Sequence, residues 1–149
     1  MNRFKFVIHW WFLFFLLVVI VGCGKSSEEI RKEARIKLGQ MGINYSEEEF
    51  MNRIINNDDI AAKLFIDAGI DVNAKGKDGY TPLINAAAGG GNLEIVKLLI
   101  DKGAEVNVSN KYGKTALEIA VDKSYTDIVK LLEGAGARLF VLPEGANNK

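Results

Sequence analysis

The chain has 149 residues, enough for one domain or slightly more, and its 19 Lys and Arg residues balance its 19 Asp and Glu residues. The absence of a basic excess argues against a nucleic-acid binder that works through bulk charge. A single Cys excludes a disulfide scaffold within the chain. Apolar residues make up 48% of the sequence, but residues 1–22 alone hold 17 of them. That segment and the remainder therefore have different roles.

Residues 1–22 have the pattern of a signal for export. Arg3 and Lys5 form a charged start, and the segment from Val7 to Val21 is apolar apart from His9. This apolar run of about 15 residues is shorter than the ~20 that span a bilayer as a helix. An uncleaved membrane anchor and a buried helix are the alternatives to an export signal.

The end of this segment, Ile20-Val21-Gly22-Cys23, resembles the lipobox of bacterial lipoproteins. The resemblance implies that residues 1–22 form a lipoprotein signal peptide that is cut off, and that Cys23 then carries palmitate or similar acyl chains. Two or three chains would hold the protein firmly to a membrane. In that family an Asp after the Cys favours the inner membrane. Gly24 therefore favours the outer membrane facing the periplasm, with the inner membrane and the cell surface as alternatives.

Residues 23–44 form a leader that contains one helix. Ser26 and Glu29 match a capping box, and apolar residues follow at helical spacing. Gly39 or Gly42 is expected to end this helix. We expect it to shield the start of the next part of the chain, although a simple spacer from the membrane is the alternative.

Residues 45–138 contain three copies of one pattern. Phe50 is followed by Leu83 after 33 residues and by Leu117 after a further 34. This is the period of the ankyrin repeat. The same spacing separates three lysines: Lys63, Lys97 and Lys130.

The second and third copies resemble the ankyrin family in detail. The matching segments are Gly79-Tyr80-Thr81-Pro82-Leu83, Ala86-Ala87, residues 94–99, residues 103–107, residues 113–117, residues 127–132 and Gly136-Ala137. The resemblance implies an all-α solenoid of about three helix-pair repeats with an N-terminal capping helix. Its repeats would cover about 45–76, 77–110 and 111–138, with a C-terminal cap and tail over 139–149.

Residues at the predicted helix ends support this fold. Thr81 is expected to cap a helix with Pro82 at its first position. Two capping boxes are expected, at Ser46 with Glu49 and at Thr115 with Glu118. Left-handed glycines should end the second helices, and an Asn should open each connecting finger. These residues are Gly69, Gly103, Gly136, Asn73 and Asn107.

Three features depart from the family pattern. The His that usually follows Thr-Pro-Leu is missing; its positions hold Met51, Ile84 and Glu118. Arg53 stands where Ala is expected, so the first repeat should be atypical. The triplet Gly89-Gly90-Gly91 adds one residue and should make a flexible turn, either a tolerated insertion or a mobile contact loop.

The end of the chain breaks the pattern. Residues 138–143 form an apolar strip that is expected to cover the last helix pair. A strand that pairs with a partner is the alternative. Residues 144–149 have the composition of a disordered tail.

The residues that remain after Cys23 limit the chemistry. They include no His and no further Cys, which excludes a Ser-His-Asp triad, a Cys-His pair and zinc held by His or Cys. The clusters Glu47-Glu48-Glu49 and Asp58-Asp59 fit helix starts, where negative charge is stabilised. Acid–base or calcium roles are the alternatives. We therefore expect no enzyme, no cofactor and no metal.

The ankyrin resemblance implies a protein-binding surface on the fingertips and the inner faces of the first helices. Matching positions in the fingers are Lys75, Lys77, Asp78, Tyr80, Ser109, Lys111, Tyr112 and Lys114. Those at the ends of the first helices are Ala88, Gly89, Asp122 and Lys123. Five Lys against two Asp predict a partner with an acidic patch, and solvated lysines on exposed turns are the alternative. Two Tyr suit an interface.

The sequence thus predicts a membrane-anchored lipoprotein that acts as a protein–protein interaction module in the bacterial cell envelope. An immunity or inhibitor protein against a periplasmic toxin is a more specific alternative. A structural envelope scaffold with several weak partners is another, and an enzyme that uses carboxylates alone is the third class. Neither nucleic acid nor a small-molecule substrate is expected.

Overall fold

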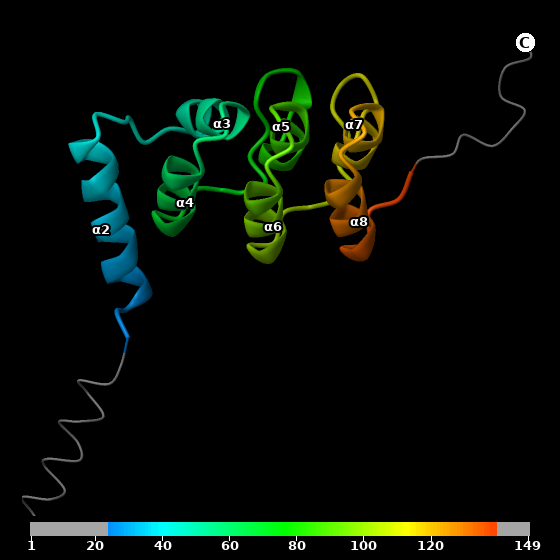
Figure 1. Ribbon diagram of the computed structural model, residues 1–149. Helices are drawn as coiled ribbons and strands as arrows, with labels where there is room; N and C mark the ends of the chain where they lie inside the picture. The colour runs from blue at the N-terminus through cyan, green and yellow to red at the C-terminus, as the bar shows by residue number, and fades with distance from the viewer. Residues whose placement is uncertain (1–23, 140–149) are drawn as a thin grey trace, which may run out of the picture.

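The computed structural model describes residues 24–139, where all structure is helical except one isolated antiparallel bridge between Ser109 and Thr115. The elements in this range are α2 (Ser27–Gln40), α3 (Glu47–Ile55), α4 (Asp59–Asp67), the short 3-10 helix η1 (Lys77–Gly79), α5 (Pro82–Ala88), α6 (Leu93–Asp101), α7 (Ala116–Asp122) and α8 (Thr126–Gly134). Figure 1 shows three helix pairs side by side, with α2 at one end of the row. The predicted all-α solenoid is confirmed.

The helices form two layers. The first helices α3, α5 and α7 pack on one another in one layer, and the second helices α4, α6 and α8 form the other (Figure 1). Ala86 and Ala120 are fully buried in the first layer, where a small side chain lets neighbouring helices approach closely. Leu99 and Leu132 are fully buried in the second. A single core therefore runs through the row.

Short-range hydrogen bonds start these helices as predicted. The Thr81 hydroxyl accepts from the backbone N–H of Ile84 at 3.3 Å, and Pro82 occupies the first position of α5. Reciprocal capping boxes start α7 at Thr115 and α2 at Ser26.

The capping box predicted at Ser46 is half formed, because the return hydrogen bond from the Ser46 backbone N–H to the Glu49 side chain is absent. Ser46 accepts from the backbone N–H of Glu49 at 3.2 Å, but the Glu49 carboxylate accepts from Arg53 Nε at 2.7 Å instead of returning to Ser46. Arg53 also reaches Asp58 at 3.3 Å. A charge-assisted bond to a guanidinium is stronger than one to a neutral amide, so Arg53 takes the carboxylate. The first pair is atypical here, as its sequence predicts.

The connections between helix pairs repeat the same left-handed glycine and the same pair of hydrogen bonds. The glycines that end α4, α6 and α8 have the predicted left-handed conformation, with φ of 85°, 87° and 91° at Gly69, Gly103 and Gly136. Asn73 donates to the Gly103 carbonyl at 3.1 Å and accepts from the N–H of Glu105 at 2.8 Å. Asn107 makes the same two bonds one repeat later, to Gly136 and Arg138. Each Asn therefore joins its finger to the next helix end.

The N-terminal helix α2 packs against α4 and so covers the exposed end of the second layer. Ala34 and Leu38 are its buried residues. Between α2 and the array, the Tyr45 ring stacks on the Phe65 ring with centroids 5.7 Å apart. The Arg35 guanidinium lies 4.6 Å from the centroid of the Tyr45 ring. The Tyr45 hydroxyl donates to the Ala68 carbonyl at 3.2 Å.

The glycine-rich turn after α5 is packed between its neighbours. A Cβ on Gly89 would lie 2.4 Å from the carbonyl oxygen of Ile55, and one on Gly91 would lie 2.8 Å from the Tyr125 ring. Asn57 donates to the Gly89 carbonyl at 3.2 Å. These contacts with both adjacent pairs restrain a turn that the sequence predicts to be flexible.

Several predictions fall outside the described residues. They concern the signal segment 1–22, the lipid site at Cys23 and the residues of the apolar strip and tail from 140 onward. None of the helices between residues 24 and 139 is long and apolar enough to cross a membrane.

Candidate functional site

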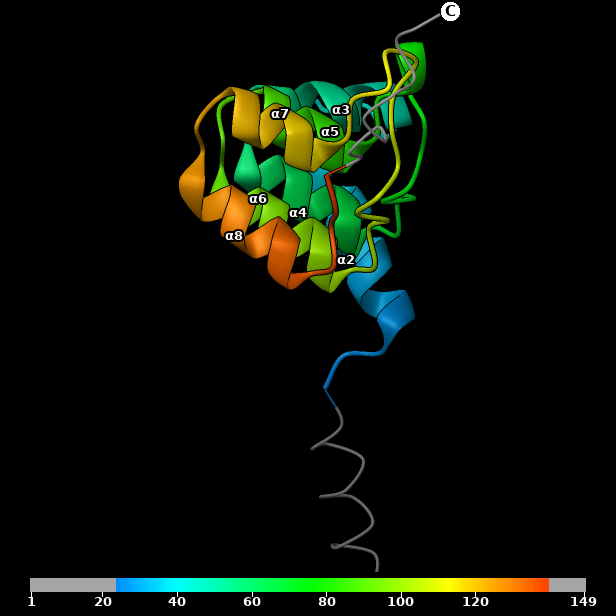
Figure 2. The same ribbon diagram turned by 90° about the vertical axis from the view of Figure 1, so that its right-hand side faces the viewer.

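Two fingers extend from the array beside the first helices (Figure 2). Finger 1 (residues 74–80) is closed by a hydrogen bond from Gly76 N–H to the Tyr80 carbonyl at 2.9 Å, and finger 2 (residues 108–114) by one from Asn110 N–H to the Lys114 carbonyl at 3.0 Å. The Lys111 N–H donates to the Asp78 carbonyl at 2.9 Å. The two fingertips therefore form one connected edge.

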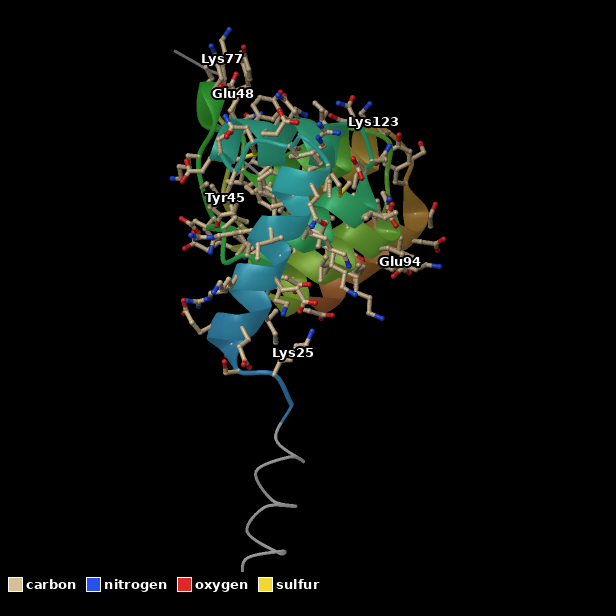
Figure 3. The ribbon with its side chains drawn as sticks, turned by 90° about the vertical axis from the view of Figure 1, so that its left-hand side faces the viewer. Lys25, Tyr45, Glu48, Lys77, Glu94 and Lys123 are labelled. Atoms are coloured by element: carbon tan, nitrogen blue, oxygen red, sulfur yellow. The ribbon has the colours of Figure 1, made fainter. Side chains whose placement is uncertain are left out.

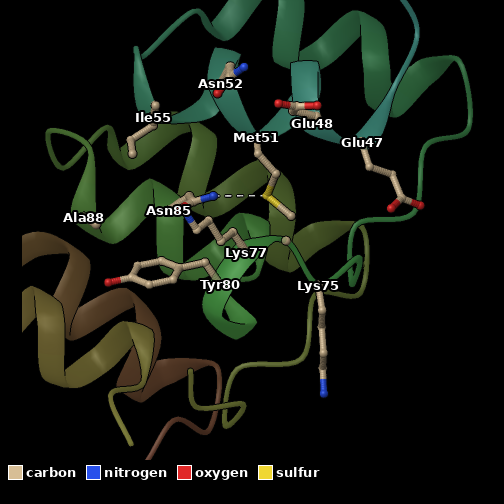
Figure 4. Close-up of a pocket in the computed structure, with 11 residues that line it drawn as sticks. Glu47, Glu48, Met51, Asn52, Ile55, Lys75, Lys77, Tyr80, Asn85 and Ala88 are labelled. Atoms are coloured by element: carbon tan, nitrogen blue, oxygen red, sulfur yellow. Dashed lines mark hydrogen bonds between the residues drawn. The ribbon is translucent and has the colours of Figure 1, made fainter. Parts of the chain in front are cut away.

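An open hollow of about 770 Å³, which we call the groove, lies between α3, finger 1 and α5 (Figure 4). Its volume is within the ~300–1,000 Å³ common for ligand pockets. The residues that line it are Glu47, Glu48, Met51, Asn52, Ile55, Lys75, Gly76, Lys77, Tyr80, Asn85 and Ala88.

The floor of the groove is mostly apolar. Met51 and Asn85 are buried, and the Asn85 amide donates to the Met51 sulfur at 3.1 Å, which fixes both side chains (Figure 4). Ile55 remains 43% exposed, so part of its side chain is free to contact a bound molecule. Tyr80 is half-buried at the finger side.

The walls of the groove carry opposite charges. Glu47 and Glu48 lie at the start of α3, and Lys75 and Lys77 lie on finger 1. Figure 3 shows Glu48 and Lys77 at the same edge of the molecule. Within residues 24–139 these four side chains take part in no ion pair. Their charges are available to a bound molecule.

Finger 2 differs, because its lysines are already paired. Lys111 Nζ lies 2.6 Å from the Asp78 carboxylate, and Lys114 Nζ lies 3.0 Å from Asp122. The hydrogen bond from Lys111 lowers the pKa of Asp78, and the same bond raises the pKa of Lys111. Hydrogen bonding to Asp122 likewise raises the pKa of Lys114. These pairs match the charges of Lys111 and Lys114 and leave Lys75 and Lys77 as the finger lysines without a carboxylate partner among residues 24–139.

The other predicted residues are spread over the surface. Tyr112 is 62% exposed at the tip of finger 2, with the Lys111 ammonium 5.0 Å from its ring centroid. Ser109 is exposed at the base of the same finger. Lys123 lies on the side opposite Lys77 (Figure 3). The structure thus brings Lys75, Lys77 and Tyr80 together in the groove and leaves Lys123 apart.

Sequence reasoning missed the helix side of the groove. It assigned Glu47 and Glu48 to stabilising the start of a helix, with acid–base or calcium roles as the alternatives, and it did not select Met51, Ile55 or Asn85 for binding. The pair Ile54-Ile55 carried a usable signal, because a helix that buries one of two adjacent isoleucines leaves the other outside its apolar face. Ile54 is fully buried, and Ile55 is the exposed one.

The groove offers apolar area, charges and hydrogen-bonding groups for binding. Between residues 24 and 139, no three His, Cys, Asp or Glu side chains are grouped so that they could hold a metal ion. A family model described as ankyrin repeats (3 copies) matches residues 50–140. No curated protein matches the sequence.

Proposed function

Because the chain belongs to the ankyrin-repeat family, we propose that it binds another protein through the groove and the adjoining fingers, at the bacterial cell envelope. The family generally serves as a non-enzymatic protein–protein interaction module. The groove is the observation that supports this site, since it combines exposed Ile55 with charged side chains that have no ion-pair partner among the described residues. Interfaces combine apolar contacts with charged and polar groups around them.

The partner has an acidic patch that faces finger 1. Lys75 and Lys77 lie there without a carboxylate partner among residues 24–139, so they attract acidic groups without breaking an internal pair. The test is affinity capture of partners from the cell envelope by the full chain. We expect capture to be lost with Ile55→Asn and weakened with Lys77→Glu, and retained with Ile60→Asn, which alters an exposed Ile on α4 outside the groove. Capture that none of these changes affects contradicts the assignment.

We also propose that Cys23 is the lipid attachment site and that residues 1–22 are removed from it. The support is the charged start, the apolar run and Ile20-Val21-Gly22-Cys23. Labelled palmitate should enter the wild-type chain and fail to enter Cys23→Ser, which should also leave the membrane fraction. Label in Cys23→Ser, or none in the wild type, contradicts the anchor. Fractionation of the two membranes tests the expected location at the outer membrane, facing the periplasm.

The number and affinity of the captured partners separate two finer roles. One tightly bound partner that is a secreted toxin supports the immunity or inhibitor role. Several weak envelope partners support a scaffold. Both roles use the same groove, and the outcome is measured in the same capture experiment.

A further inference from the structure

The charges on the groove are arranged on two facing sides, and this arrangement restricts what can bind. Acidic Glu47 and Glu48 stand on the α3 side, and basic Lys75 and Lys77 stand on the finger side. A partner that is acidic throughout would be attracted to one side and repelled by the other, since like charges that meet at an interface cost free energy. A partner with both charges satisfies both sides.

The exposed apolar contact of the groove lies at the other end of α3 from the acidic residues, since Glu47 and Glu48 are in the first turn of this helix and Ile55 is its last residue. Met51 is held by Asn85 beneath the groove, and Ile55 is the exposed apolar side chain within it (Figure 4). The positions that correspond to Ile55 in the next two pairs, by the repeat spacing, are Ala88 and Asp122. Ala88 is small and Asp122 is paired with Lys114, so among these three equivalent positions only the first pair offers a large apolar side chain. This restriction leaves room for one apolar anchor.

We propose that the groove binds a linear segment of the partner that carries one apolar, one basic and one acidic side chain, with the apolar and basic ones spaced to reach the two ends of α3. The inference rests on the proposed protein-binding function and narrows the class of partner. The apolar side chain covers Ile55, the basic residue faces Glu48 and the acidic residue faces Lys77. The apolar anchor provides most of the affinity, because exposed ion pairs contribute little, and the two charges set the direction of the segment.

Peptides that bind the full chain in detergent test this directly. A random peptide library is selected on the wild-type chain, and affinities of the selected peptides are measured by fluorescence anisotropy. We expect sequences that share one apolar, one basic and one acidic residue, with a constant spacing between the apolar and the basic residue. Glu47→Lys with Glu48→Lys, or Lys75→Glu with Lys77→Glu, should weaken binding about threefold, less than the loss of the apolar contact. A peptide in which the residue that faces the substituted side has the opposite charge should bind the corresponding variant with restored affinity. It should not bind the other variant more tightly.

Matched controls separate the groove from general charge and folding effects. Ile55→Asn should weaken binding about tenfold, whereas Ile60→Asn should leave it unchanged. Glu94→Lys on α6 changes the net charge as one groove substitution does, but it lies away from Glu48 and Lys77 (Figure 3) and should have no effect. Far-UV circular dichroism checks that every variant is folded.

The outcomes distinguish this inference from the proposed function. Selected peptides that lack a basic residue and ignore Glu47→Lys with Glu48→Lys overturn the two-sided segment, and so does the absence of any selected peptide. The protein-binding function still stands in either case if capture of the native partner is lost with Ile55→Asn. Capture that no groove or finger substitution changes overturns the proposed function itself.

Discussion

Single asparagines connect the pairs of this array. Asn73 and Asn107 each use both ends of a side-chain amide, one to a helix-end carbonyl and one to a backbone N–H two residues further on. A helix end leaves such backbone groups without a partner inside the helix. The Asn supplies both partners from the neighbouring repeat, which no apolar contact could do.

Asn73→Ala should lower the free energy of unfolding by about 1–3 kcal/mol, because it removes two hydrogen bonds and leaves their backbone partners unmatched. Urea denaturation followed by circular dichroism measures the change. Asn44→Ala is the control, since Asn44 is exposed and its side chain makes no hydrogen bond within residues 24–139. Equal effects of the two substitutions would show that the bridge contributes nothing specific.

Substitution by Ala should change the stability of the protein in opposite directions at Gly89 and at Gly39. Gly89→Ala places a Cβ 2.4 Å from the Ile55 carbonyl oxygen, so the two helices must separate, at a cost of about 1–3 kcal/mol. Gly39→Ala meets open space inside α2 and should stabilise by about 0.5–1 kcal/mol. Thermal unfolding of both variants measures this. A Gly89→Ala chain as stable as wild type would refute the close packing of this turn.

At the scale of the elements, the distance over which residues interact determines what the sequence could predict. The caps at Thr81 and Thr115 were predictable, because donor and acceptor lie three residues apart. The repeat spacing likewise located both fingers. The Asp78–Lys111 pair was not predictable, because it joins two fingers and depends on how the repeats stack. At Glu49 two donors competed, and only the folded position of Arg53 decided between them.

Docking of α2 should depend on Tyr45. Tyr45→Phe loses the hydrogen bond to Ala68 and should cost about 1 kcal/mol, whereas Tyr45→Ala also loses the stack on Phe65 and should cost about 3 kcal/mol. Hydrogen exchange should accelerate in α2 more than in α8. An increase that is uniform along the array would contradict a local role for this ring.

The link between the fingers should appear in the titration of Asp78. Lys111 lowers the pKa of this carboxyl, so any stability from the pair is present above the ordinary pKa of Asp and is lost as the pH falls through the lowered value. Lys111→Met should raise the pKa of Asp78 toward its ordinary value, as carbon-detected NMR titration would show. Lys75→Met should leave it unchanged. A pKa of Asp78 that is the same in both variants would contradict the pair.

For the whole molecule, the period predicted the stacked array, but the groove emerged only from the fold. It combines α3, a finger that follows α4, and α5, whose lining residues extend along the chain from Glu47 to Ala88. The family pattern directed attention to the fingers. Glu48 and Ile55 belong to the first pair, whose departures from that pattern made its inner face hard to recognise in the sequence.

Stacking should also make the array unfold as one unit. Each pair contacts only its neighbours, and three pairs are close to the smallest stable number, so damage to the central pair removes support from both ends. Leu99→Ala in α6 should therefore cost about 2–5 kcal/mol and lower one common melting temperature, because Leu99 is fully buried between α4 and α8. Leu93→Ala on the same helix should cost less than about 1 kcal/mol, since Leu93 is 38% exposed. Circular dichroism and the NMR signals of the Tyr45 and Tyr125 rings, at opposite ends of the array, should show one common melting transition in both variants. A Leu99→Ala chain in which one end melts before the other would show that the pairs are stable separately.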